Sequence, residues 1–454
     1  MLLGSILVGM PVGSFYSWSV FIDPIQRARP DFSSGASVHA NSVVISALSI
    51  SCAATGKILG YKYGLKQVSA VGAVVSALGL AMCGLSVLYG IEWMLLAGGG
   101  LNGLGMGAPY VCFIKAFKTT FHDFPGFAAG WVMFASSAGS FVFVWVSHAL
   151  LDHFKRAYPS SEITAPAVTF FILGGILLLM QFTGSFLLVE TPTVKKNGDS
   201  EPNGDESGAE IDESDSKSDR LEDPLIAGEA NSKEAKRTAR PVLSSTRDVL
   251  SSIQFWLVMF VFFSNLFPVL GVLTIFASYV QSRFPGTTST MAANSLAIIN
   301  VVGTAWRLLV GFISEHVGRF ELFVIALILQ TALFATLAFT IDQSDMTLSL
   351  FTGIVCVCKI CYGSGFTLIN LLIDEVFGKA NGTQVYGLVI FGLMAASLAS
   401  PNIASVWYKK SDSADATFDN EEIRPYFIIS FAVTTSGVLS LLLLRCMSRN
   451  RLRG

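Results

Sequence analysis

The sequence predicts an all-α polytopic membrane protein with twelve transmembrane helices in two six-helix bundles. Of its 454 residues 52% are hydrophobic and only 14% are charged, whereas a soluble chain carries about a quarter charged residues. Stretches such as 68–90 and 167–189 contain no Asp, Glu, Lys or Arg. Each is long enough to cross the ~30 Å hydrocarbon core of a bilayer. These observations argue for a lipid bilayer as the surroundings and against a soluble fold.

Twelve apolar runs and one long polar segment set the expected order of elements. The polar segment separates an N-terminal six-helix bundle (1–189) from a C-terminal six-helix bundle with a short basic tail (248–454). The linker between them, 190–247, is acidic at first and basic at its end, and has too little apolar surface to fold, so we expect it to be disordered. The expected spans are 2–22, 38–57, 68–90, 93–116, 127–150, 167–189, 253–280, 292–313, 321–341, 347–374, 384–407 and 425–446.

Lysine and arginine indicate the orientation. Eleven of them lie in the tail and the short connections on the side of the N-terminus, against eight on the other side. By the positive-inside rule, both termini and the linker then face the cytoplasm. No cleavable signal peptide is expected, because the first apolar run is long and lacks a basic leader. The membrane is expected to be the plasma membrane or that of an organelle.

Composition also argues against several other classes of protein. The net charge of −2 shows no excess of positive charge of the kind that binds nucleic acid. The seven cysteines lie in or beside apolar stretches, which argues against a disulfide framework. The five histidines are too scattered for a ligand set, so neither a metal nor another cofactor is expected. With no paired carboxylates or Ser/His dyad at membrane depth, we do not expect an enzyme.

Arg307 is the strongest functional signal. It lies within an apolar span, about 22 Å from the outer end at 1.5 Å per residue. A charge at a helix centre costs at least ~2.5–3.5 kcal/mol, so the guanidinium should face a partner or a watery cavity. It shares a helix face with Asn300, Gly303, Thr304 and Gly311. A guanidinium binds a carboxylate through two parallel hydrogen bonds, although an inter-helix ion pair or snorkelling is the alternative.

Lys359 is the second cation at depth, with Tyr362 and Phe366 on the same face of its helix. Either it joins Arg307 in binding a dicarboxylate, or it points elsewhere and a single cation serves a monocarboxylate. Aromatic side chains confine a small anion, and Tyr16, Trp18 and Tyr110 are candidates for this role or for plain packing.

Four local motifs, in order, carry a resemblance. They are Gly13-Ser14-Phe15-Tyr16-Ser17-Trp18-Ser19-Val20-Phe21, Gly103-Leu104-Gly105-Met106-Gly107-Ala108-Pro109-Tyr110, the run from Arg307 to Arg319, and Gly363-Ser364-Gly365-Phe366 with its continuation to Pro401. With the six-plus-six pattern, they resemble the major facilitator superfamily and, within it, the oxalate/formate antiporters and monocarboxylate transporters. The resemblance implies that Arg307 binds a substrate carboxylate.

The resemblance also implies gating residues, and the chain departs from the family pattern in three places. The superfamily's inner-loop motif falls on Gly64 and Lys66, with Tyr61 where an Asp is expected. Its counterpart falls on residues of the eighth span and the loop after it: Gly311, Glu315, Gly318 and Arg319. Helix eleven lacks the antiporters' second cation, which Lys359 is hypothesised to replace. Gly303 stands where monocarboxylate transporters carry a proton-coupling Asp, so exchange, facilitated diffusion and proton symport all stay open.

The expected function is therefore transport of small carboxylate anions by alternating access, by a protein that works as a monomer. The alternatives are a transporter of the same fold for another small metabolite, such as an amino acid, and a receptor of that fold that does not transport.

Overall fold

Every element of the computed structural model is helical within the residues that it describes, which are 2–33, 36–58, 64–188, 246–284, 286–340, 346–378, 381–408 and 420–453. The N-terminal half comprises α1 (Leu2–Gly13), the 3-10 helix η1 (Ser14–Phe21), α2 (Ile22–Ala28), α3 (Ala36–Ile58), α4 (Leu65–Tyr89), α5 (Glu92–Thr120), α6 (Pro125–Ala157) and α7 (Thr164–Leu187). The C-terminal half comprises α9 (Thr246–Ser251), α10 (Ile253–Arg283), α11 (Ser289–Val317), α12 (Arg319–Thr340), α13 (Leu348–Phe377), α14 (Gly382–Val389), α15 (Phe391–Tyr408) and α16 (Asn420–Arg453).

Each predicted span coincides with a helix or a pair of consecutive helices, so the predicted helical architecture is confirmed. Two spans are broken. The first changes from α-helix to 3-10 helix after Gly13, and the eleventh is divided at Ile390 into α14 and α15. The central segment 190–247 lies outside the described residues, except that Thr246 and Arg247 begin α9.

Nine helices in the described part of the chain are by themselves long and apolar enough to cross a membrane. The other expected spans correspond to α1 with η1, α3 and α5. Here α1 is short, α3 is rich in serine and α5 is rich in glycine. Small and weakly polar residues lower the hydropathy of a helix but permit close helix–helix contact in lipid. These helices therefore cross the membrane inside the bundle rather than at its lipid-facing surface.

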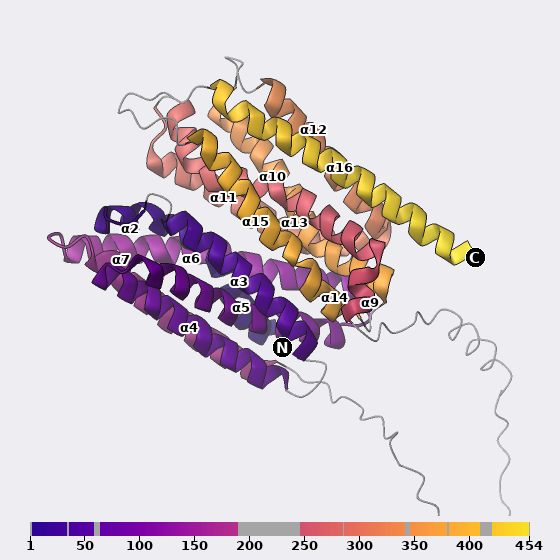
Figure 1. Ribbon diagram of the computed structural model, residues 1–454, viewed down its shortest axis with the longest axis horizontal. Coiled ribbons are helices and arrows are strands. Elements are labelled where there is room, and N and C mark those ends of the chain that lie inside the picture. The colour runs from indigo at the N-terminus through magenta and orange to yellow at the C-terminus, as the bar shows by residue number, and fades with distance from the viewer. Residues whose placement is uncertain are drawn as a thin grey trace, which may run out of the picture. The chain divides into compact units, whose positions relative to one another are not determined.

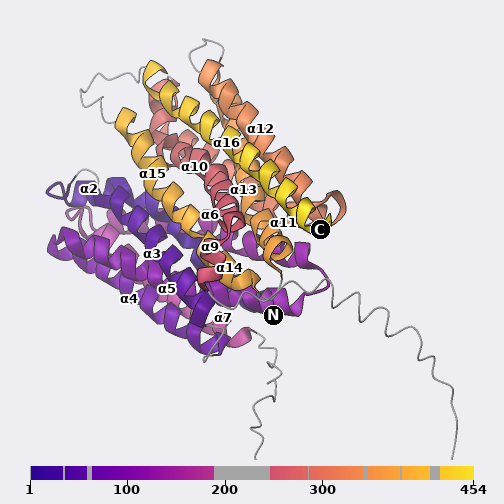
Figure 2. The ribbon, with the colours of Figure 1, turned by 45° about the vertical axis from the view of Figure 1, so that its right-hand side comes forward.

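The two halves pack against each other through four main helix pairs. Helix α6 contacts α11 and α13, and α3 contacts α14 and α15. Figure 1 shows the two halves on either side of this interface, the first in indigo to magenta and the second in pink to yellow. Figures 1 and 2 place both chain ends at the same end of the bundle as α9 and α14, with α2 at the other end. We call the end that holds the chain termini the terminal side.

Glycines allow the N-terminal helices to approach closely. A Cβ atom on Gly105 of α5 would collide with the backbone nitrogen of Ser76 in α4, and one on Gly103 would collide with the carbonyl oxygen of Val44 in α3. Gly98 and Gly107 meet the same helices in the same way. The glycine run of the fourth span therefore packs backbone against backbone, as expected for helices associating in lipid.

We predict that Gly105→Ala lowers the free energy of unfolding by about 1–3 kcal/mol, the usual cost of overpacking. The measurement is thermal unfolding of the purified protein in detergent. Gly175→Ala is the matched control, because nothing lies within 4 Å of a Cβ atom at that helical position. Equal losses in the two variants would contradict the packing argument.

Candidate functional site

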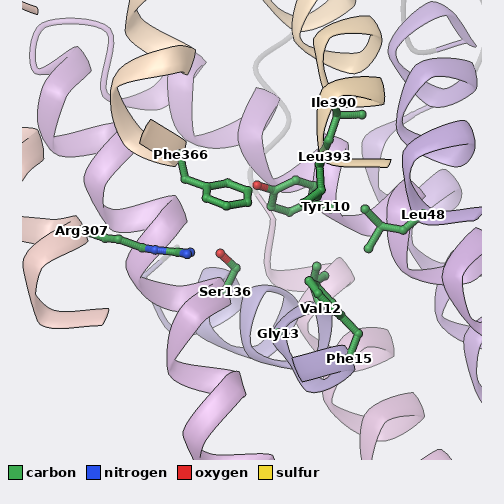
Figure 3. A pocket seen from close by; sticks show the side chains of 10 residues that line it. All are labelled: Val12, Gly13, Phe15, Leu48, Tyr110, Ser136, Arg307, Phe366, Ile390 and Leu393. Carbon is green, nitrogen blue, oxygen red and sulfur yellow. The ribbon is translucent and has the colours of Figure 1, made fainter. Parts of the chain in front are cut away.

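A small cavity lies between the two halves, at the middle of the bundle. Its volume of about 20 Å³ is enough for a water molecule. Figure 3 shows the side chain of Arg307 reaching toward Ser136, with the rings of Phe366 and Tyr110 beside it. Both halves supply its walls, which consist of Val12, Gly13, Phe15, Leu48, Tyr110, Ser136, Arg307, Phe366, Ile390 and Leu393.

Arg307 of α11 is only 3% exposed. Its Cζ atom lies 4.7 Å from the ring centroid of Phe366 and 5.6 Å from that of Tyr362. Gly363 of α13 makes room for it, because a Cβ atom there would lie 3.2 Å from its Cγ atom. Its buried Nε has no hydrogen-bond partner, and no described Asp or Glu forms an ion pair with it. Two aromatic faces offset only part of the cost of burying this charge.

Lys359 of α13 is also buried, at 5% exposed. Its Nζ atom lies 4.6 Å from the ring centroid of Tyr362, so the two cations flank the same aromatic ring. Its aliphatic stem crosses Gly303, where a Cβ atom would lie 2.5 Å from its Cγ atom. Lys359 does not line the cavity itself. Tyr362, whose ring contacts both cations, does not line the cavity either.

The other predicted binding residues divide into three groups. Tyr110 and Phe366 line the cavity with Arg307. Trp18 does not; it lines a separate small cavity inside the N-terminal half and donates a hydrogen bond from Nε1 to the carbonyl oxygen of Ser37. Asn300 is half-buried on α11 and lies outside the cavity lining. The side chain of Tyr16 lies outside the described residues.

Sequence reasoning missed most of the cavity wall, including Phe15, Leu48, Ser136 and Leu393. Apolar and hydroxyl side chains like these are common throughout the spans and carry no distinctive signal. Two further wall residues lie where the helices break: Gly13 ends α1, and Ile390 separates α14 from α15. Gly13 is itself a break signal that the sequence shows. Ile390, by contrast, is flanked by Gly387 and Gly392, from which no break is predicted.

Contacts between the halves close the terminal side of this cavity. The hydroxyl oxygens of Tyr110 and Tyr386 are 2.9 Å apart, joining α5 to α14. Nearer the terminal side, the Nζ atom of Lys118 lies 2.9 Å from Oδ2 of Asp374. These two side chains are only 18% and 11% exposed, so their ion pair is partly shielded from water.

Glu315 makes a further contact at the terminal side. Its Oε1 accepts hydrogen bonds from the backbone N–H groups of Gly126 and Phe127, at 3.0 and 3.2 Å. These N–H groups begin α6, and a carboxylate at a helix N-terminus is stabilised by the helix dipole. Gly311, one turn earlier, packs its backbone on that of Gly126.

The remaining predicted gating residues lie in or beside terminal-side connections. Gly318 has a φ of 94° in the turn between α11 and α12, a conformation that favours glycine, and Arg319 begins α12. Gly64 and Lys66 lie at the start of α4, while Tyr61 lies outside the described residues.

A sequence profile described as the Major Facilitator Superfamily matches residues 2–401 of the chain. The chain belongs to the Major Facilitator Superfamily. It is therefore an integral, multi-pass membrane transporter that works by alternating access.

Individual superfamily members are more distant. The uncharacterized MFS-type transporter YhjX of Escherichia coli (strain K12) is 23% identical over 400 residues, covering 87% of this chain and 85% of the relative. The structure is similar to that of the superfamily transporter FucP in its outward conformation, with a TM-score of 0.60, 16% identity and coverage of 98% of this chain and 97% of FucP. It is also similar to the proton:xylose symporter XylE, with a TM-score of 0.62, 14% identity and coverage of 96% and 94%. At these identities the solved structures establish the fold alone.

We predict that Asp374→Asn, which removes the ion pair with Lys118, speeds maleimide labelling of Cys52 about fivefold, the ratio that corresponds to roughly 1 kcal/mol. Cys52 is fully buried, and its backbone meets Gly387 of α14 across the interface between the halves. It becomes reactive only when the terminal side opens. Labelling is measured by mass spectrometry of cysteine-containing peptides.

Two controls accompany this measurement. Asp123→Asn changes an exposed carboxylate whose recorded ion pair is with its neighbour His122, and it should leave the labelling rate unchanged. Cys83 is buried inside the N-terminal half, where its thiol donates to the carbonyl oxygen of Leu95, and it reports general unfolding. Faster labelling of Cys52 and Cys83 together would contradict opening at the interface.

Proposed function

We propose that this transporter carries small carboxylate anions and that Arg307 binds the carboxylate. The observation that carries the proposal is a buried guanidinium at the cavity between the halves, with no acidic partner among the described residues. Two oxygens of a carboxylate match the two parallel N–H groups of a guanidinium. An anion bound there would supply the missing partner and lower the cost of the buried charge.

The small volume of the cavity supports a small substrate and a site that opens when the two halves move apart. About 20 Å³ is too little for even a small carboxylate, so the halves must separate before an anion enters. Contacts lie on both sides of the site: the Tyr110–Tyr386 pair and Glu315 on the terminal side, and a hydrogen bond of 3.4 Å from Ser42 to the carbonyl oxygen of Ser397 toward the other side. Releasing one set at a time would expose Arg307 to one side at a time.

The proposed orientation places the terminal side in the cytoplasm, as the distribution of lysine and arginine predicts. Anion exchange or facilitated diffusion fits the site better than coupling through an acidic residue beside Arg307. At Gly303, the position of the proton-coupling Asp in the monocarboxylate transporters, the space is filled by the stem of Lys359.

The test is counterflow of labelled oxalate, formate, lactate and pyruvate into liposomes. Arg307→Lys keeps the positive charge but loses the two parallel N–H donors of the guanidinium. We therefore expect substrate affinity to fall roughly tenfold to a hundredfold, the range for loss of a hydrogen bond to a charged group. Arg307→Ala should abolish uptake. Arg156→Lys is the control, because Arg156 lies at the exposed end of α6. Normal carboxylate uptake by a correctly folded Arg307→Ala variant would exclude the proposal.

Substitution of Lys359 tests whether the protein carries dicarboxylates as well as monocarboxylates. If it supplies a second positive charge to the site, Lys359→Met abolishes uptake of the dicarboxylate oxalate and spares lactate and pyruvate. Methionine keeps most of the stem that packs on Gly303, so the change removes mainly the ammonium group. Uptake of all four anions at the wild-type rate would show that Arg307 is the sole binding cation.

A further inference from the structure

A second and larger cavity lies within the N-terminal half, away from the interface between the halves. Its volume is about 280 Å³. Residues from the end of η1, from α2, from the last turns of α6 and from the start of α7 line it. Among the residues that the structure describes, all those that line it belong to the N-terminal half. It is therefore built separately from the cavity between the halves.

The cavity lies on the side opposite the chain termini, at the end of the apolar part of α6. Trp145 of α6 is 66% exposed, as expected for a residue of the aromatic belt at a membrane–water interface. His148, the first residue of α6 that lines the cavity, follows three residues later, roughly 5 Å further along the helix axis. The predicted span of α6 ends at residue 150, among these lining residues. Headgroup regions add about 5–7 Å of thickness on each side of the hydrocarbon core, so the α6 lining begins at their level.

The lining combines an apolar floor with charges of both signs. The floor is formed by side chains such as Leu151 and Pro166. Arg27 of α2 and Lys155 of α6 carry positive charge, and Asp152 and Glu162 carry negative charge. His148 also lines the cavity, and its Nδ1 lies 3.3 Å from Oδ2 of Asp152. Apart from His148, the charges sum to zero, which suits a zwitterionic ligand better than an anion.

We propose that this cavity binds the headgroup of a phospholipid that carries both a phosphate and a primary ammonium. Arg27 and Lys155 hold the phosphate, because both donate charge-assisted hydrogen bonds to phosphate oxygens. Asp152 and Glu162 accept hydrogen bonds from the ammonium group. The apolar floor contacts the glycerol and the first methylene groups of the chains.

A primary ammonium fits this lining better than a choline group does. Quaternary ammonium groups have no N–H donors and are bound by cages of several aromatic rings. Among the described residues that line the cavity, Tyr158 is the one Phe, Tyr or Trp side chain. An anionic headgroup without an amine would leave Asp152 and Glu162 facing a like charge.

The experiment is native mass spectrometry of the whole protein released from nanodiscs that contain equal amounts of phosphatidylethanolamine, phosphatidylcholine and phosphatidylglycerol. We expect retained phosphatidylethanolamine to exceed the other two. The double variant Asp152→Asn, Glu162→Gln should reduce its preference over phosphatidylcholine about two- to fivefold, the effect of exposed charge pairs. Lys155→Gln should weaken retention of all three lipids by a similar factor.

The neighbouring residue supplies a matched control. Arg156 follows Lys155 on α6 but does not line the cavity, so Arg156→Gln should retain lipid as the wild type does. Equal losses from Lys155→Gln and Arg156→Gln, or equal retention of the three lipids by the wild type, would overturn the proposal. Displacement of the lipid by millimolar free phosphoethanolamine would show that the site serves a soluble ligand instead. Thermal unfolding of each purified variant in detergent confirms that it is folded.

Discussion

The organisation of this transporter depends on one buried guanidinium. Arg307 is held between α11 and α13 by the faces of Phe366 and Tyr362, and no described acidic side chain balances it. A charge in such surroundings is costly unless a solvated or charged partner can reach it. The structure meets this requirement with the cavity at the interface of the two halves. The aromatic faces stabilise the guanidinium but accept no conventional hydrogen bond, so its buried Nε–H is left without a partner.

Beside the cavity, α1 and α6 cross in close backbone contact. Gly13 at the end of α1 and Gly139 of α6 each lie against the backbone of the other helix, at Ser136 and Met10. Because glycines stand at these crossings, the backbones of α1 and α6 approach closely at the point where α1 changes to a 3-10 helix. Ser17 supports that change by donating a hydrogen bond to the carbonyl oxygen of Ser14. Broken helices at a binding site are tolerated in membranes where the freed backbone groups find partners or face a cavity.

In the described part of the chain, the halves are held together on the terminal side by three polar contacts and by the backbone packing of Gly311 on Gly126. An ion pair, a hydroxyl pair and a carboxylate at a helix N-terminus can each exchange their partner for water when the halves separate. Glycine contacts such as those of Gly103 and Gly105 have no such substitute, because separating them leaves voids. The glycine packing inside each half therefore favours motion of each half as a rigid body.

The sequence by itself determined the twelve-span architecture, because hydrocarbon admits only long apolar segments whose backbone groups are paired internally. It also singled out Arg307, since a charge within such a segment is rare and costly. The tertiary structure decided what surrounds it. Phe15, Leu48, Ile390 and Leu393 line the cavity only because distant spans meet there, and as ordinary apolar residues they could not be told from those that face lipid. Trp18 illustrates the same limit: its type and helix suggested the central site, but helix rotation places it in a neighbouring cavity. Rotation and contact depend on packing against other helices, which no local pattern records.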